Sequence, residues 1–173
     1  MTNEVLTAIK NRRSCRAYKP EQITDAELNA VLEAGTYAAS AKGLQSAKIV
    51  VVQDAETRAL LSRMNAAVMG ADKDPMYGAP SVLVVLADAN APCAVQDGSL
   101  VMGNLMLAAS SIGLGSCWIN RAKEVFASDE GKALLKKWGI NGEWVGVGHC
   151  ILGYPAAEPK PAAPRKADYI VRV

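Results

Sequence analysis

The chain lacks several features that would assign it to a common functional class. Its 173 residues include a single histidine and carry a formal net charge of only +2. A charge this close to zero gives no global attraction for nucleic acid or an anionic membrane, so any anion site must be local. The one histidine, His149, lies in an apolar segment without a recognisable partner. This argues against a Ser-His-Asp triad and favours a structural role for the ring.

Sequence signals for metal binding and membrane targeting are also absent. The cysteines, none in CxxC spacing, are Cys15, Cys93, Cys117 and Cys150. We therefore expect free thiols, with neither a zinc site nor a disulfide framework. The first residues do not resemble a signal peptide, and the most apolar stretch, residues 99–115, is too short to span a bilayer. The sequence predicts a cytoplasmic protein that binds no metal, membrane or nucleic acid.

The remaining pattern is that of a single globular domain covering residues 1–173. Apolar segments, β-branched or alternating, predict strands at residues 49–52, 81–87, 116–120 and 144–152. Apolar residues at helical spacing predict helices at residues 3–11, 55–69, 94–112 and 129–138. Thr24 and Glu27 have the spacing of a capping box at the start of another helix. Strands interspersed with helices indicate an α+β or α/β domain, with parallel and antiparallel pairing both open.

The C-terminal region, residues 155–173, reads as an extended arm followed by a strand. Four of the eight prolines fall between residues 155 and 166, and residues 168–173 alternate as a strand does. A strand at the end of a long arm is unusual within one small domain. It is explained if the strand pairs with another sheet, such as that of a second copy.

A basic cluster near the N-terminus is the sharpest local signal for a ligand. Arg12, Arg13 and Arg16, with the hydroxyl of Ser14, can bind a phosphate through bidentate hydrogen bonds. The alternative is that they complement the carbonyl end of the first helix. A second basic pair at residues 165–166 gains interest only if the fold brings it back to the first cluster.

Known phosphate loops do not match this chain. Residues 113–115 and 146–148 lack the third glycine of a dinucleotide-binding loop, and the glycines at 98 and 103 are followed by Asn104 rather than lysine. A Rossmann domain and a P-loop NTPase are therefore disfavoured. Because no acid or base stands out, we expect no catalytic side chain and a cofactor that carries the chemistry.

Several motifs, read together, resemble those of the nitroreductase family. They are RRSCRAY at 12–18, AASAKGLQ at 38–45, YGAP at 77–80, GLGSCWI at 113–119, LGYP at 152–155 and PRK at 164–166. Each is weak alone, but they follow the family's order from residue 9 to residue 170. The second motif departs from the common pattern, with Ala39, Gly43, Ser46 and Ala47 where the family usually has Pro, Asn, Pro and Trp. Gly43 lacks the asparagine side chain and retains only its N–H.

The resemblance implies an α+β fold, with a mixed sheet flanked by helices and the C-terminal strand exchanged in a homodimer. It implies one FMN at each subunit interface. The residues expected to bind it are Arg12, Arg13, Ser14, Arg16, Ser40, Gln45, Asn65, Asn104, Leu114, Gly115, Arg165 and Lys166. Asn65 and Asn104 could instead have core or capping roles. Arg13 or Arg165 could supply positive charge near the flavin N1.

The activity implied by the resemblance is electron transfer from NADH or NADPH to nitroaromatics, quinones or similar electron-poor small molecules. Donor and acceptor would react in turn, in a ping-pong scheme. A second interpretation is a flavin-binding protein with another role, such as a flavin-consuming or dehalogenating enzyme, a carrier or a sensor. A third is an anion-binding structural dimer without flavin.

Overall fold

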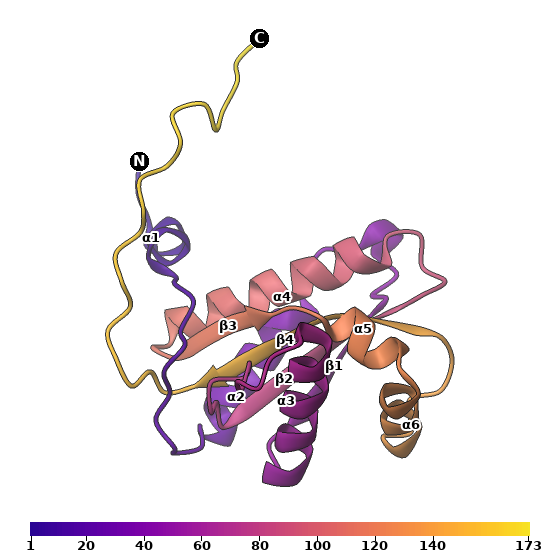
Figure 1. Cartoon of the computed structure of the whole chain (residues 1–173). Helices are drawn as coiled ribbons and strands as arrows, with labels where there is room; N and C mark the ends of the chain where they lie inside the picture. The colour runs from indigo at the N-terminus through magenta and orange to yellow at the C-terminus, as the bar shows by residue number, and fades with distance from the viewer.

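A four-stranded sheet lies at the centre of the computed structural model, which describes residues 1–173 (Figure 1). Its strands are β1 (Ala47–Val52), β2 (Ser81–Asp88), β3 (Gly115–Ile119) and β4 (Trp144–Gly153). They are arranged in the order β1-β2-β4-β3, and every neighbouring pair is antiparallel. β2 is buried along almost its whole length because helices cover both faces of the sheet.

Five of the six α-helices form the two covering layers. The helices are α1 (Glu4–Asn11), α2 (Asp25–Thr36), α3 (Ala55–Met69), α4 (Ala94–Ser111), α5 (Ala122–Ala127) and α6 (Asp129–Lys137). On one face α2 and α4 pack on the sheet, where Val31 and Leu105 share a cluster with Leu83 of β2. On the other face α3, α5 and α6 share a cluster with Val82 and Val84. Side chains therefore alternate along β2 between two apolar layers.

Most of the predicted elements are confirmed. α3 has the predicted bounds, and the capping box is formed: Glu27 N donates to Thr24 Oγ1 over 3.2 Å and Thr24 N to Glu27 Oε2 over 2.8 Å. The helix α5 was not anticipated.

The predicted α+β fold is confirmed, but the sheet is not mixed. The only parallel pairing is an isolated bridge between Ser14 and Ser116, outside the sheet's own strand pairs. A buried β-branched run is compatible with either sense of pairing, so its composition does not distinguish them. Here β1 leads to its neighbour β2 and β3 to its neighbour β4 in the opposite direction, whereas the chain passes from β2 to β3 across the place that β4 later fills.

Two glycines of β4 allow other elements to approach it closely, as the Gly-Val-Gly pattern predicted. A Cβ on Gly146 would lie 2.2 Å from the carbonyl oxygen of Ala122, at the start of α5. A Cβ on Gly148 would lie 2.5 Å from Trp118 Nε1 on β3. Larger residues at these positions would push α5 and the Trp118 ring away from the sheet.

The two ends of the chain lie outside the packed layers (Figure 1). α1 has no buried residue, and Val5 and Ile9 are 61% and 54% exposed. Residues 157–173 are exposed and form no strand with the chain's own sheet, so strand exchange remains a prediction. The arm is joined to the body at its start, where Ala156 N donates to Ala17 O over 2.9 Å. None of the helices combines the length and hydropathy needed to cross a bilayer.

Candidate functional site

The basic segment after α1 is fixed against the edge strand β3. α1 is capped at its N-terminus by Asn3, whose side chain accepts a hydrogen bond from Leu6 N, and at its C-terminus by Arg12. The chain then runs extended: Cys15 N donates to Ser116 O over 2.9 Å. The half-buried phenol of Tyr18 donates to Cys15 O over 2.9 Å. Burial raises the pKa of Tyr18, so the phenol stays a neutral donor that secures this turn.

Within this segment the guanidiniums retain unused hydrogen-bonding capacity. Arg13 Nη1 donates to the carbonyls of Lys10 and Arg12, at 2.7 and 2.6 Å, as a helix cap would. Arg13 Nε and Arg12 Nη1, however, are both buried without a hydrogen-bond partner. The only ion pair of the chain joins Arg63 to Glu130, so no carboxylate neutralises the cluster. Buried unpaired donors are costly, and an incoming anion or polar ligand would satisfy them.

A cavity of about 770 Å³ opens beside this segment. Its wall brings together the N-terminal cluster, the loop before β3 and the start of the arm. The lining includes Arg13, Ser14, Cys15, Arg16, Leu114, Gly115, Glu158 and Lys160. The lining therefore carries three cationic side chains, Arg13, Arg16 and Lys160, and one carboxylate, Glu158. We call this space the arginine cavity.

The loop before β3 allows the backbone to come close to the arginine segment. Gly113 has φ of +84°, a conformation that glycine adopts readily. A Cβ on Gly115 would lie 2.7 Å from Cys15 Sγ, so a larger residue would displace the segment. The predicted site residues Leu114 and Gly115 thus lie beside Arg13, Ser14 and Arg16, as their common cavity shows.

The second predicted segment, around Ser40 and Gln45, lines a different cavity of about 400 Å³. This cavity lies between the end of α2, the start of α4 and β1, and it shares no lining residue with the arginine cavity. Ser40 Oγ accepts a hydrogen bond from Gln45 N over 3.0 Å. In one chain the two predicted parts of the site therefore line two separate cavities.

Five predicted site residues line neither cavity: Arg12, which directly precedes the cavity residue Arg13, and Asn65, Asn104, Arg165 and Lys166. Asn65 is fully buried and its Nδ2 donates to Asn120 O over 2.7 Å, on the α3 side of the sheet. Asn104 Nδ2 donates to Ala34 O over 2.9 Å and links α4 to α2. Arg165 and Lys166 are exposed on the arm, where the Arg165 guanidinium reaches only Ala163 O. Each asparagine thus makes one structural hydrogen bond, with Asn65 Oδ1 left without a partner, while the basic pair is free in a single chain.

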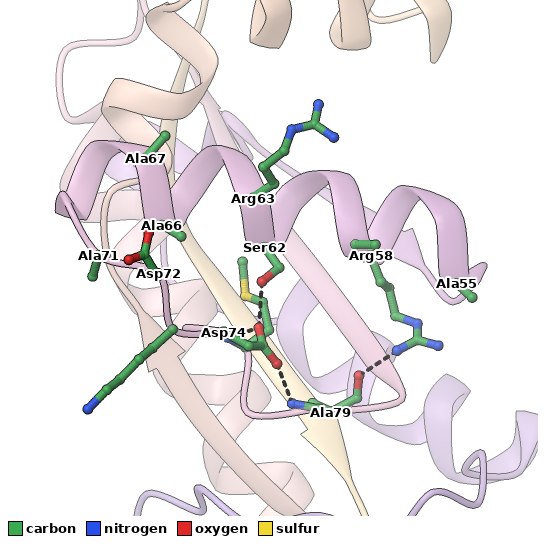
Figure 2. A pocket seen from close by; sticks show the side chains of 14 residues that line it. Ala55, Arg58, Ser62, Arg63, Ala66, Ala67, Ala71, Asp72, Asp74 and Ala79 are labelled. Atoms are coloured by element: carbon green, nitrogen blue, oxygen red, sulfur yellow. Dashed lines mark hydrogen bonds between the residues drawn. The ribbon is translucent and has the colours of Figure 1, made fainter.

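A third cavity, of about 720 Å³, lies between α3 and the loop that leads to β2 (Figure 2). Three of its five charged residues, Arg58, Arg63 and Asp74, are already bonded within the chain. Arg58 donates to Ala79 O over 3.0 Å, and Asp74 accepts from the amides of Met76 and Gly78 and from the Ser62 hydroxyl. None of the predicted site residues lines it, and the two charged residues without a partner, Asp72 and Lys73, are exposed and of opposite sign.

Two functional features were missed by the motif analysis. Asp97, a buried carboxylate at the start of α4, contacts the Ser40–Gln45 segment, and Lys160 adds a cation to the arginine cavity. The signal for Asp97 was present, because a carboxylate near the start of a helix that is apolar nearly all round requires a specific partner. Lys160 carried no signal, since its place depends on the path of the arm.

Comparison with known proteins identifies the class to which this fold and site belong. The family model described as "Nitroreductase family" matches residues 9–74 and 66–154, and the chain belongs to this family of oxidoreductases. A curated protein of Archaeoglobus fulgidus is 34% identical over 161 residues, 90% of this chain and 87% of that protein. It bears the provisional name NADH dehydrogenase/NAD(P)H nitroreductase.

Solved structures agree with this assignment. A nitroreductase of Bacteroides fragilis with bound FMN superimposes with a TM-score of 0.90 at 32% identity, over 99% of this chain and 100% of that one. A nitroreductase of Desulfitobacterium hafniense with bound FMN gives a TM-score of 0.89 at 26% identity, over 100% of both chains. The resemblance noted from the motifs is confirmed.

Proposed function

We propose that this chain binds FMN in the arginine cavity and catalyses electron transfer from NADH or NADPH to nitroaromatics, quinones or similar electron-poor acceptors. The observation that carries the proposal is the unpaired Nε of Arg13 on the cavity wall, together with the free side chain of Arg16. Arg12 Nη1 is also unpaired, although Arg12 does not line the cavity. The FMN bound by two similar structures is an anion of suitable chemistry for these donors.

Each part of the cavity has a distinct task in this proposal. Arg12, Arg13 and Arg16 hold the phosphate, and the Ser14 hydroxyl supplies a further hydrogen bond. Leu114 and Gly115 offer backbone groups to the ring system, because the missing side chain of Gly115 lets the two segments meet. Bound FMN supplies the capacity to accept two electrons from a nicotinamide and to pass them on. The protein needs no acid or base of its own beyond these binding groups.

A homodimer would complete the site. α1 and the arm carry exposed apolar side chains, among them Val5, Ile9, Tyr169 and Val171, which a second copy would cover. A second copy would also bring the Ser40–Gln45 wall of one chain to the arginine cavity of the other. The exchanged strand, residues 168–173, would carry Arg165 and Lys166 toward a phosphate, which their free side chains in the single chain permit.

Equilibrium binding of FMN tests the location of the cofactor. Replacing Arg16 by Ala removes a free guanidinium from the cavity and should weaken FMN binding about 10- to 100-fold, since hydrogen bonds to charged groups contribute about 1.5–3 kcal/mol. Arg63→Ala is the matched control, because Arg63 is exposed and pairs only with Glu130. Equal affinity of the wild type and Arg16→Ala would refute the placement.

The redox role is tested separately by anaerobic titration of the FMN-loaded protein with NADH and NADPH. We expect a donor to bleach the yellow colour, and steady-state plots for a nitroaromatic and for a quinone to give parallel lines. Intersecting lines would contradict alternate use of one site by donor and acceptor. A yellow protein that no nicotinamide bleaches would instead indicate a flavin-binding protein with another role.

A further inference from the structure

A single buried carboxylate secures both ends of the segment that the proposed function assigns to the second wall of the flavin site. Asp97 lies in the first turn of α4 and is 4% exposed. Its Oδ1 accepts a hydrogen bond from Ala41 N over 2.9 Å, and its Oδ2 accepts one from Ser46 Oγ over 2.8 Å. Both oxygens are therefore used, and both partners belong to the chain just before β1.

The segment between these two contacts has an unusual backbone. Lys42 and Gln45 have φ of 54° and 49°, in the left-handed region that side chains other than glycine rarely adopt. Gly43 lies between them with φ of 67°. Residues in such conformations persist only where their surroundings impose them, and they gather at functional sites. Asp97 supplies this constraint from outside the segment, and the contact from Ser40 Oγ to Gln45 N supplies it from within.

The constrained segment is not part of the core. Residues 42–45 are all exposed, and Leu44 retains 53% of its accessible surface. A buried carboxylate that fixes an exposed and strained segment contributes little to packing. Asp97 instead determines the backbone conformation that residues 41–46 present at the surface.

We propose that Asp97 is a positioning residue, which holds residues 41–46 in the shape that contacts the flavin; this rests on the proposed function. Asp97 lines the second cavity, but both of its oxygens already accept hydrogen bonds from within the chain. Its effect passes through the Ala41 amide and the Ser46 hydroxyl, so the geometry of its two acceptor oxygens matters more than its charge.

Three variants separate these contributions. Asp97→Ala removes both hydrogen bonds. Asp97→Asn retains both, because the amide oxygen can accept from Ala41 N while the amide nitrogen donates to Ser46 Oγ. Ser46→Ala removes one of them at a half-buried position and leaves α4 intact. Leu134→Ala, on α6 across the sheet, is the matched control that destabilises the fold without touching the segment.

Amide hydrogen exchange without added flavin, followed at Gln45, gives a readout independent of activity. Gln45 N is bonded to Ser40 rather than to Asp97, so its exchange rate reports the opening of the whole segment. We expect at least about tenfold faster exchange in Asp97→Ala, a smaller increase in Ser46→Ala, and a rate close to wild type in Asp97→Asn. FMN affinity should fall about 10- to 100-fold in Asp97→Ala and stay within about threefold in Asp97→Asn.

Two results would overturn the positioning role. One is unchanged exchange at Gln45 in Asp97→Ala, or a change no larger than that in Leu134→Ala. The other is an Asp97→Asn variant that behaves as Asp97→Ala does, since geometry would then not be what Asp97 provides. Wild-type protein that takes up no FMN would refute the proposed function instead, and the exchange data would still decide whether Asp97 holds the segment.

Discussion

Acidification should destabilise this protein through His149, the one histidine of the chain. The ring is fully buried beside Phe126, with ring centroids 6.0 Å apart, and neither ring nitrogen has a hydrogen-bond partner. Burial lowers the pKa of His149 to about 4, although the nearby backbone of Ile119 and Asn120 opposes the shift. The folded state therefore binds the proton more weakly than the unfolded state, whose pKa is about 6.5.

The direction and size of the effect follow from this difference. Well above pH 6.5 the ring is neutral in both the folded and the unfolded state, so His149 contributes no pH dependence to the free energy of unfolding. As the pH falls from 6.5 toward 4, only the unfolded state gains a proton, so the free energy of unfolding decreases. One pKa unit corresponds to about 1.4 kcal/mol, so the loss is about 2 kcal/mol at pH 5 and about 3 kcal/mol at pH 4.

Urea unfolding followed by tryptophan fluorescence, at fixed protein concentration and at pH 7.5 and 5.0, measures this loss. His149→Leu replaces the ring by an apolar side chain of similar volume that cannot titrate. Carboxylates such as Glu27, whose pKa is lowered by its hydrogen bonds to Thr24 and Tyr154, titrate alike in both proteins and cancel in the comparison. Equal losses of stability in wild type and His149→Leu between the two pH values would refute the assignment of a buried neutral ring.

Three further outcomes are expected. Gly146→Ala should lower stability by about 2–3 kcal/mol in thermal unfolding, because its Cβ would meet the Ala122 carbonyl. Gly103→Ala, with open space around the added Cβ, is the control and should not destabilise. Equal effects of the two substitutions would contradict the close approach of α5 to β4. Thr24→Ala should cost about 1 kcal/mol by removing the helix cap, and restoration by Ser at this position checks the cause. Truncation after Ala156 should halve the mass measured by light scattering, and an unchanged mass would argue against exchange of the arm.

Local structure was the part of the fold that the sequence predicted best. The spacing of Thr24 and Glu27 determines a cap within one turn, and the apolar positions of α3 recur often enough to define its bounds. α5 was missed because its six residues are too few to show a period. The sense of strand pairing was open because it depends on how the helices cross the sheet, and no single strand records that path.

The site residues likewise divide into those whose neighbours in sequence made them predictable and those whose role depends on the fold or on a second chain. Arg13, Ser14 and Arg16 are neighbours in sequence and remain so in the cavity, and β3, which follows the glycine loop, joins this segment through one backbone bridge from Ser116 to Ser14. Asn65 shows the opposite case, since its polarity alone could not tell a ligand contact from the core bond to Asn120. Arg165 has no fixed environment in one chain, and its role depends on a surface that a single sequence describes only indirectly.

The exposure of α1 links assembly to ligand affinity. This helix carries the arginine cluster at its end yet buries none of its own residues, so few packing contacts hold it in the isolated chain. A second copy that covers Val5 and Ile9 would also restrict the positions of the guanidiniums. A phosphate bound by the guanidiniums would in turn restrict the position of α1. In the proposed homodimer, dilution of the protein should therefore release FMN, and saturating FMN should make the subunits harder to separate.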